Sequence, residues 1–139
     1  MAFQDHFSGH AASYAAHRPT YPSSLFERLS ELVPNHDTAW DCATGNGQAA
    51  VALTDYFKNV IATDASDRQL SAAEAHPKIR YLCAPAESTP IEDRSIDLVT
   101  VAQALHWFDV EAFYEEVDRV LRPGGVLAAW CYSWSTISP

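Results

Sequence analysis

The sequence WDCATGNGQ, residues 40–48, constrains the fold of this chain more than any other stretch. Asp41 closes a short apolar run, Gly45 and Gly47 follow it, and residues 48–57 form an alanine-rich run that is typical of a helix. Glycine has no Cβ and can adopt positive φ, so a strand, a glycine turn and a helix in this order let a ligand approach the backbone at the helix N-terminus. The pattern predicts a ligand-binding turn.

A second acidic residue, Asp64, ends the next apolar run, VIATD, 17 residues after Gly47. A carboxylate at the end of a second strand, at about this separation, can reach a ribose hydroxyl. Asp64 could instead cap the following helix, but Ser66 fits that position better. A glycine pair alone also fits a tight helix entry. Together with Asp64, however, it predicts a nucleoside-binding site in a doubly wound α/β domain.

Composition narrows the class of protein. A chain of 139 residues that is 47% hydrophobic suits one domain with one packed core. The net charge of −9 and the lack of a basic run argue against a nucleic-acid partner. No apolar run is long enough for a membrane span, and the N-terminus does not look like a secretory signal. Three widely spaced cysteines and six scattered histidines predict reduced thiols, no metal site and a cytoplasmic protein.

Hydrophobic periodicity alternates between strand-like and helix-like runs along the chain. Ser24 with Glu27, and Ser66 with Gln69, fit capping boxes, and Asp109 is placed to cap the last helix. The stretch LRPGG, residues 121–125, predicts a turn, and residues 85–95 predict a polar connection without a full helix. The expected helices are 24–33, 48–57, 66 to about 76 and 110–121, and the expected strands are 38–43, 60–64, 79–84, 96–102 and 126–134.

This alternation predicts the α/β class, with an open, mostly parallel sheet and helices on both faces. Right-handed crossovers give the strand order 3-2-1-4-5. The ligand should lie outside the carboxyl ends of the first and fourth strands, where the order reverses. The acidic run Glu111, Glu115, Glu116 and Asp118 is expected on the solvated face of the last helix.

The turn leaves two classes of nucleotide ligand open. A nicotinamide dinucleotide site favours GxGxxG, and Ala50 occupies the third position here. Asp41 at the start of the turn would face a pyrophosphate poorly, and it suits a ligand with a cationic end. An NAD(P)-binding domain remains the alternative.

Six stretches follow one another along nearly the whole chain: YAAHRPTYP (14–22), WDCATGNGQ (40–48), VIATDAS (60–66), APAE (84–87), AQALHWF (102–108) and LRPGG (121–125). Together they resemble the class I S-adenosylmethionine-dependent methyltransferases. Within that family the chain is similar to the small-molecule group that includes trans-aconitate methyltransferase.

The resemblance implies S-adenosylmethionine as the cofactor and a role for each matching residue. The turn would wrap the methionine part of the cofactor. Asp64 would accept hydrogen bonds from both ribose hydroxyls, and Ala65 would pack on the adenine ring. Ala86 would bind the adenine edge through its backbone, with Glu87 beside it. The implied cofactor-binding residues are Tyr14, Arg18, Asp41, Ala43, Gly45, Gly47, Asp64, Ala65, Ala86, Glu87, Gln103 and Ala104.

The resemblance also implies how the reaction would proceed. Residues 1–22 would form an arm that closes over the cofactor, with Arg18 paired to its carboxylate. His106 and Trp107 would face the methyl group and a small-molecule acceptor, with His106 as a candidate base. The competing interpretations are that His106 is a polar residue at the border of a pocket and that Trp107 is a core residue. A carboxylate acceptor would need no base, because the cofactor is already activated.

The chain departs from the family pattern at three places. Ala43 stands where a glycine is usual, and Pro85 stands where many relatives carry an aspartate for the adenine amino group. The family's sheet continues past the fifth strand, so we expect residues 1–139 to be a single domain that is truncated at its C-terminus. The fifth strand would then be an open edge that a second copy could pair with, giving a homodimer. A module that binds the cofactor without turnover is also open.

Overall fold

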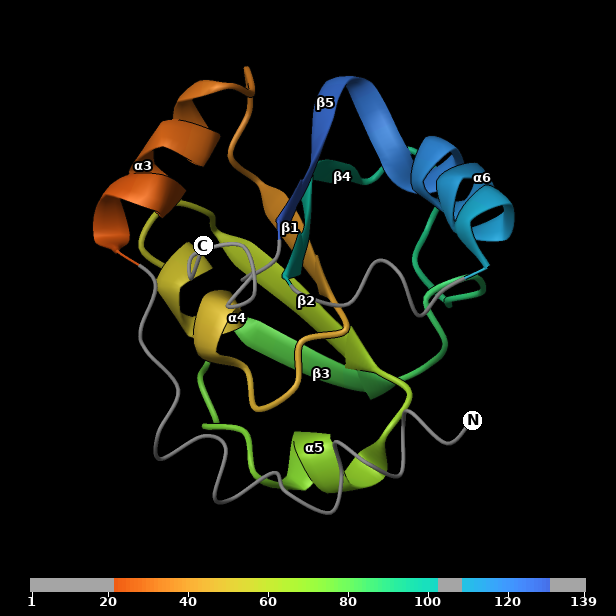
Figure 1. Cartoon of the computed structure of the whole chain (residues 1–139). Coiled ribbons are helices and arrows are strands. Elements are labelled where there is room, and N and C mark those ends of the chain that lie inside the picture. Colours follow the sequence, from red (N-terminus) through yellow and green to blue (C-terminus); the bar gives the residue numbers. More distant parts are fainter. Residues whose placement is uncertain (1–21, 103–108, 131–139) are drawn as a thin grey trace, which may run out of the picture.

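The computed structural model describes residues 22–102 and 109–130, which form one five-stranded sheet with helices on both faces (Figure 1). All neighbouring strands are parallel, in the order β3-β2-β1-β4-β5. The predicted fold class and strand order are confirmed. The strands are β1 (Thr38–Cys42), β2 (Asn59–Asp64), β3 (Ile79–Cys83), β4 (Ile96–Ala102) and β5 (Leu121–Trp130).

The helices are α3 (Ser23–Glu31), α4 (Gln48–Leu53), α5 (Asp67–Ser71) and α6 (Val110–Val120). The capping box expected at Ser24 is wrong, because α3 begins one residue earlier and its N-cap, Pro22, makes no side-chain bond. Ser66 does cap α5, and its hydroxyl accepts the N–H of Gln69. α5 ends at Ser71, well before the expected residue 76, and its last turn is closed by i→i+3 bonds from the N–H groups of Ala72 and Ala73 to the carbonyls of Gln69 and Leu70.

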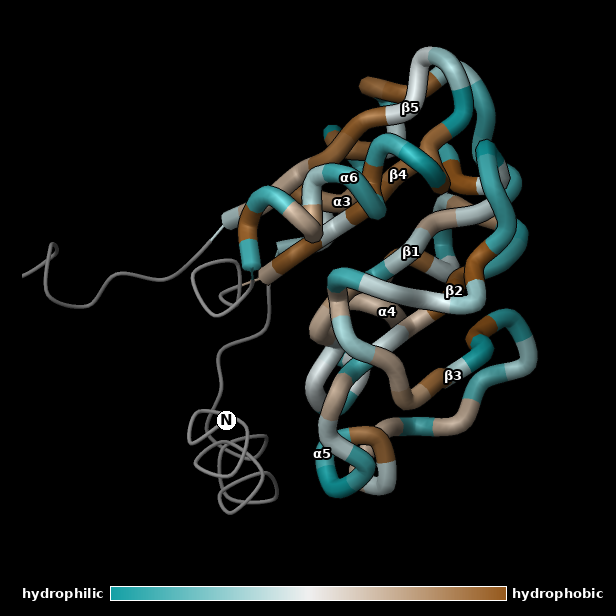
Figure 2. Tube along the Cα trace, turned by 90° about the vertical axis from the view of Figure 1, so that its right-hand side faces the viewer, coloured by the Kyte–Doolittle hydropathy of each residue, from teal (hydrophilic) through white to brown (hydrophobic). Residues whose placement is uncertain are grey.

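The sheet separates two apolar clusters. On one face α3 and α4 pack Phe26, Leu29 and Leu53 against the strands, and on the other face α6 packs Phe113 against Trp40. β4 lies between β1 and β5 and is buried over almost its whole length, as a central parallel strand should be. Figure 2 shows hydrophobic colours gathered along the strands and hydrophilic colours in many of the connections.

The LRPGG stretch lies inside β5 and not before it, so the expected boundary is wrong. Leu121 pairs with Ile96, and pairing then resumes at Val126, opposite Leu98, after a shift of register. Gly124 has φ 87°, and such an irregularity lets the strand absorb extra residues without ending. The expected strand residues 131–134 lie outside the described part of the chain.

The amino ends of the strands are tied by charged groups, which we name the amino-edge cluster: Asp37, Lys58, Asp97 and Arg122. The buried Asp97 carboxylate accepts the N–H groups of Asp37 and Thr38 through Oδ2, each at 3.0 Å. Arg122 Nη1 lies 3.2 Å from Asp97 Oδ1 and 3.0 Å from Asp37 Oδ2. The hydrogen bond from Arg122 holds the pKa of Asp37 below its usual value.

Candidate functional site

The glycine turn after β1 is bonded to the carboxyl end of β2. The Thr44 N–H donates to the Thr63 carbonyl at 2.8 Å, and the Gly45 N–H donates to Asp64 Oδ2 at 2.9 Å. Ala43, Gly45 and Gly47 all have positive φ, of 56°, 60° and 85°. The chain therefore reverses sharply and enters α4 with Gly47 as the N-cap.

The three positive-φ positions differ in why they suit glycine. A Cβ at Gly47 would lie 2.7 Å from the Tyr81 hydroxyl, so this position needs glycine for space as well as for φ. A Cβ at Gly45 would make only an ordinary contact, 3.7 Å from Gln69 Oε1, so glycine is needed there for φ alone. Ala43 carries its Cβ in the left-handed region, which is strained by about 1–2 kcal/mol.

Asp64 is buried at the end of β2 and is held by backbone donors. Its Oδ1 accepts the Ser66 N–H at 2.9 Å and its Oδ2 accepts the Gly45 N–H at 2.9 Å. Burial raises the pKa of Asp64, and the two N–H groups act against that rise. Within the described ranges it has no ion pair. A carboxylate accepts about four hydrogen bonds, so Asp64 has capacity for further donors.

Asp41, at the end of β1, is also buried and is bound by two hydroxyl groups. Thr44 Oγ1 donates to Oδ2 at 2.6 Å and Thr100 Oγ1 donates to Oδ1 at 2.7 Å. Asp41 thus joins the glycine turn to β4. Burial raises the pKa of the adjacent Cys42 thiol, which is free, as is the exposed Cys83. Cys131 lies outside the described residues.

Two amide oxygens at the turn were missed by sequence reasoning. Asn46 Oδ1 and Gln48 Oε1 are buried and have no hydrogen-bond partner among residues 22–102 and 109–130. Buried polar atoms are usually paired, so these acceptors suit donors from a ligand. With Asp41 and Asp64 they make this edge rich in acceptors. Such an edge favours a ligand with hydroxyl and ammonium groups over one with a pyrophosphate.

The connection after β3 lies beside the end of β2. The Ala84 N–H donates to the Asp64 carbonyl at 3.0 Å. Ala65 is exposed, whereas Ala86 is buried. Glu87 Oε2 accepts the N–H of Asp109, the N-cap of α6, at 2.9 Å. The structure therefore brings the turn, Asp64, Ala65 and the connection with Ala86 to one edge of the sheet, with Glu87 directed to α6.

Six predicted site residues lie outside the described part of the chain. They are Tyr14, Arg18, Gln103, Ala104, His106 and Trp107, and their roles stay predictions. Across the part that is described, no three metal-ligating side chains come together. The helices that are described are each too short or too polar to cross a membrane.

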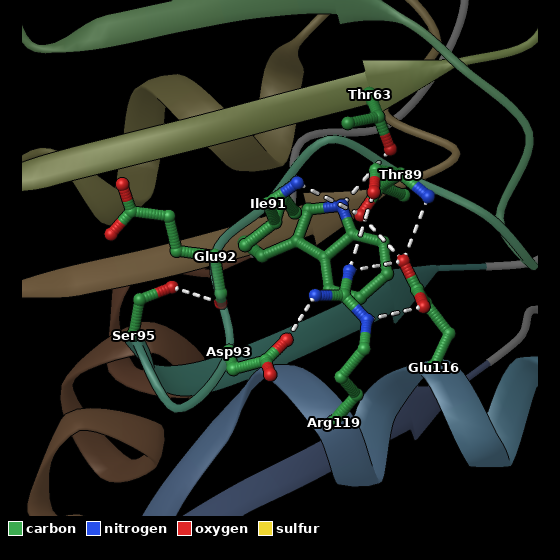
Figure 3. Close-up of polar contacts among 9 residues, drawn as sticks. Thr63, Thr89, Ile91, Glu92, Asp93, Ser95, Glu116 and Arg119 are labelled. Carbon is green, nitrogen blue, oxygen red and sulfur yellow. Dashed lines mark hydrogen bonds and ion pairs between the residues drawn. The ribbon is translucent and has the colours of Figure 1, made fainter.

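One expectation about α6 is wrong. Glu111, Glu115 and Asp118 are exposed, but Glu116 is buried, with 8% of its surface accessible. Its carboxylate contacts Arg119 on the same helix and Thr89 on the connection after β3 (Figure 3). The sequence signal would have been Arg119, three residues along the same helix, which can neutralise a buried acid.

Comparison with known proteins agrees with this geometry. A family model described as a methyltransferase domain matches residues 40–129. A Dictyostelium discoideum relative that carries a methyltransferase name is 40% identical over 137 residues, which is 98% of this chain and 52% of the relative. Saccharomyces cerevisiae CRG1, named as an S-adenosylmethionine-dependent methyltransferase, is 35% identical over 134 residues, 88% of this chain and 45% of CRG1.

A solved structure titled as a type II methyltransferase, from Anaeromyxobacter dehalogenans, superposes with a TM-score of 0.81 at 44% identity. The match covers 84% of this chain and 49% of that one. This chain spans about half the length of the curated relatives it matches. The narrower similarity to trans-aconitate methyltransferase stays a prediction. The wider one is confirmed, and this chain belongs to the family of methyltransferase domains.

Proposed function

We propose that this chain binds S-adenosylmethionine at the carboxyl edge of β1, β2 and β3 and transfers its methyl group to a small-molecule acceptor. One observation carries the proposal. Asp64 is a buried carboxylate fixed by the N–H groups of Gly45 and Ser66, with raised pKa and with capacity for two more donors. Two vicinal ribose hydroxyls would supply those donors.

The remaining described residues fit the other parts of the cofactor. Asp41 and the amide oxygens of Asn46 and Gln48 would favour the cationic methionine end. The exposed Ala65 would pack on the adenine ring, and the backbone of Ala86 would bind its edge. Glu87 Oε2 already accepts the Asp109 N–H, so Glu87 would contribute to adenine less directly than expected.

When bound, S-adenosylmethionine supplies a methyl group on a sulfonium that needs no further activation. The chain's task is to hold the nucleoside end rigid, to exclude water and to align an acceptor with the methyl group. Residues 1–22 would cover the cofactor, with Tyr14 and Arg18 at its carboxylate, and Gln103 and Ala104 would line the sulfonium side. Trp107 would face the acceptor. A carboxylate acceptor would react without a base, so the proposal does not depend on His106.

Titration calorimetry tests the choice of ligand. We expect heat from S-adenosylmethionine and S-adenosylhomocysteine, and weaker or no binding of NAD, because a pyrophosphate at the turn would meet the Asp41 carboxylate. Tighter binding of NAD would overturn the proposal and favour the dinucleotide-binding alternative.

Turnover needs a separate measurement. Labelled methyl groups should pass from S-adenosylmethionine to small carboxylic acids, or to a component of a cell extract, when this chain is added. Binding of the cofactor with no transfer to any acceptor would favour a module without turnover. A cytoplasmic location, where thiols such as Cys42 and Cys83 stay reduced, is part of the proposal.

A further inference from the structure

The connection between β3 and β4, residues 84–95, has no helix, yet it is anchored along its whole length. We name it the adenine loop, because it carries Ala86. Its beginning is bonded to β2 through the Ala84 N–H, and its end is bonded to α6 through the N–H groups of Arg94 and Ser95. Ala86 and Ile91 are buried in the same apolar cluster as Phe113 of α6. The middle of the adenine loop, between these two side chains, lacks an apolar anchor.

The Glu116 side chain, from α6, holds the middle of the adenine loop through hydrogen bonds instead (Figure 3). Its Oε2 accepts both the N–H and the hydroxyl of Thr89, each at 2.7 Å. The same oxygen accepts Arg119 Nη2 at 2.8 Å, and Oε1 accepts Arg119 Nε at 2.9 Å. Thr89 therefore has both of its donors on one buried carboxylate.

Arg119 completes the arrangement by binding the adenine loop at two further points. Its Nη2 donates to the Thr89 carbonyl at 3.2 Å, and its Nη1 lies 2.6 Å from Asp93 Oδ1. The hydrogen bond from Arg119 is the main cause that keeps the pKa of Glu116 below its usual value, and the hydrogen bonds from Thr89 contribute less. A buried carboxylate is costly unless it is paired and fully hydrogen-bonded, and this one is. An apolar residue at position 116 could pack as well but could not fix Thr89.

We propose that Glu116 is a positioning residue that fixes the adenine loop, through Thr89, in the conformation that presents the Ala86 backbone to adenine. The inference rests on the proposed function. Glu87 adds a further link from the same loop, to the N–H of Asp109, the N-cap of α6. Glu116 would touch neither cofactor nor acceptor, and its effect would pass entirely through the loop.

The test compares Glu116→Gln with Glu115→Gln. Both remove one negative charge from the same helix, but Glu115 is exposed. Thr89→Val is a second variant, which removes the hydroxyl and keeps the N–H. Each is titrated with S-adenosylhomocysteine and with S-inosylhomocysteine, in which N1 of the base carries a hydrogen and cannot accept a bond. The ratio of the two dissociation constants reports recognition of the base, not general stability.

We expect the parent chain to prefer the adenine ligand and Glu116→Gln to weaken its binding about tenfold, as for loss of one well-placed hydrogen bond. The inosine ligand should change little, so the ratio should fall toward one. Thr89→Val should show a smaller fall, and Glu115→Gln none. Equal weakening of both ligands by Glu116→Gln would overturn the inference, because that pattern indicates a merely structural role.

Failure of the proposed function gives a different pattern, in which the parent chain binds neither S-adenosylhomocysteine nor S-inosylhomocysteine. Hydrogen exchange of the full chain without ligand then still tests whether Glu116 holds Thr89 in place. Faster exchange at Thr89 in Glu116→Gln, but not in Glu115→Gln, would leave Glu116 as a loop anchor while the cofactor role falls. Equal exchange at Thr89 in both variants would show that Glu116 does not anchor the adenine loop.

Discussion

At the amino edge of the sheet, the carboxylates of Asp37 and Asp97 share the guanidinium of Arg122, whereas at the carboxyl edge Asp64 is bound by two neutral backbone N–H groups. The pKa values move in opposite directions as a result. Arg122 lowers the pKa of Asp37, and burial raises the pKa of Asp64. Both edges use aspartates, but among the described residues Asp37 and Asp97 have the cationic partner Arg122, whereas Asp64 has none.

This difference indicates what each edge is for. Asp97 binds the N–H groups of Asp37 and Thr38, at the start of β1, and the guanidinium of Arg122, so its carboxylate has little capacity left for a ligand. The N–H groups of Gly45 and Ser66 fix the orientation of the Asp64 carboxylate, and its remaining acceptor capacity is available to a ligand. The amino edge should therefore govern stability, and the carboxyl edge should govern binding. Four predictions test or sharpen that division, and a fifth concerns β5 at the side of the sheet.

The largest effect should come from Asp97→Ala. The variant leaves two half-buried N–H groups without their acceptor and removes one of the two carboxylates that bind Arg122, so the free energy of unfolding should fall by about 2–4 kcal/mol. Denaturant titration measures this, with the exposed Asp118→Ala as control. Affinity for S-adenosylhomocysteine, measured where the variant is folded, should stay within about twofold of the parent. A large loss of affinity would break the division.

Asp64→Ala should show the reverse pattern. Loss of the bonds to the ribose hydroxyls should weaken binding of S-adenosylhomocysteine by about 1–3 kcal/mol. Calorimetry should show this against Asp67→Ala, which removes the same charge from the same edge at an exposed position. An unchanged affinity in Asp64→Ala would mean that Asp64 is not the ribose ligand.

Acidification should weaken binding through Asp64. Its folded-state pKa is raised, so its charged form costs stability at neutral pH, and it takes up a proton above the ordinary value of 3.8. Hydroxyl donors favour the charged form, so affinity should be complete above the raised pKa and should fall as pH drops through it. Calorimetry across acidic pH measures this. Asp64→Asn should remove that part of the dependence, and a persistent fall in that variant would assign it to another group.

Ala43→Gly should sharpen the comparison at the carboxyl edge. Relief of the left-handed φ, less the added flexibility of glycine, should raise the free energy of unfolding by about 0.5–1 kcal/mol. Thermal unfolding measures the gain, with Ala52→Gly in α4 as a control that should lose stability instead. A destabilised Ala43→Gly would show that the Cβ contributes more than its strain costs.

The smallest effect concerns β5, which is the last strand of the sheet among the described residues. Val126 packs against the core, so a lysine there would disturb folding, but Ala129 is exposed. If two copies pair along β5, Ala129→Lys should shift light scattering from dimer to monomer without changing the midpoint of unfolding. Pro123, which the structure places in β5, already blunts part of this edge. A parent chain that is monomeric would refute the pairing.

The sequence was sufficient for the strand order, because strand-like and helix-like runs alternate along it and right-handed crossovers restrict how such strands are arranged. Asp64 could be placed at the end of β2 because it closes the apolar run VIATD. The burial of Glu116 was missed, because an acidic residue on a helix usually faces water. Arg119 on the same helix was a local signal for it, but the tertiary contact with Thr89 could not be foreseen from the sequence. The early end of α5 at Ser71 was likewise missed, because the capping residue Ser66 marks where the helix begins but no residue pattern marks where it ends.

The contact between Gly47 and Tyr81 implies a rule about variation among relatives. The aromatic ring fills the volume that any side chain at position 47 would need, so the two positions should not mutate independently. A descendant that acquires alanine at position 47 would have to shrink position 81 first and then find another backbone conformation for the turn. Loss of the ring alone would leave a gap beneath the turn while glycine stayed. Along a lineage, replacement of the tyrosine should therefore precede replacement of the glycine.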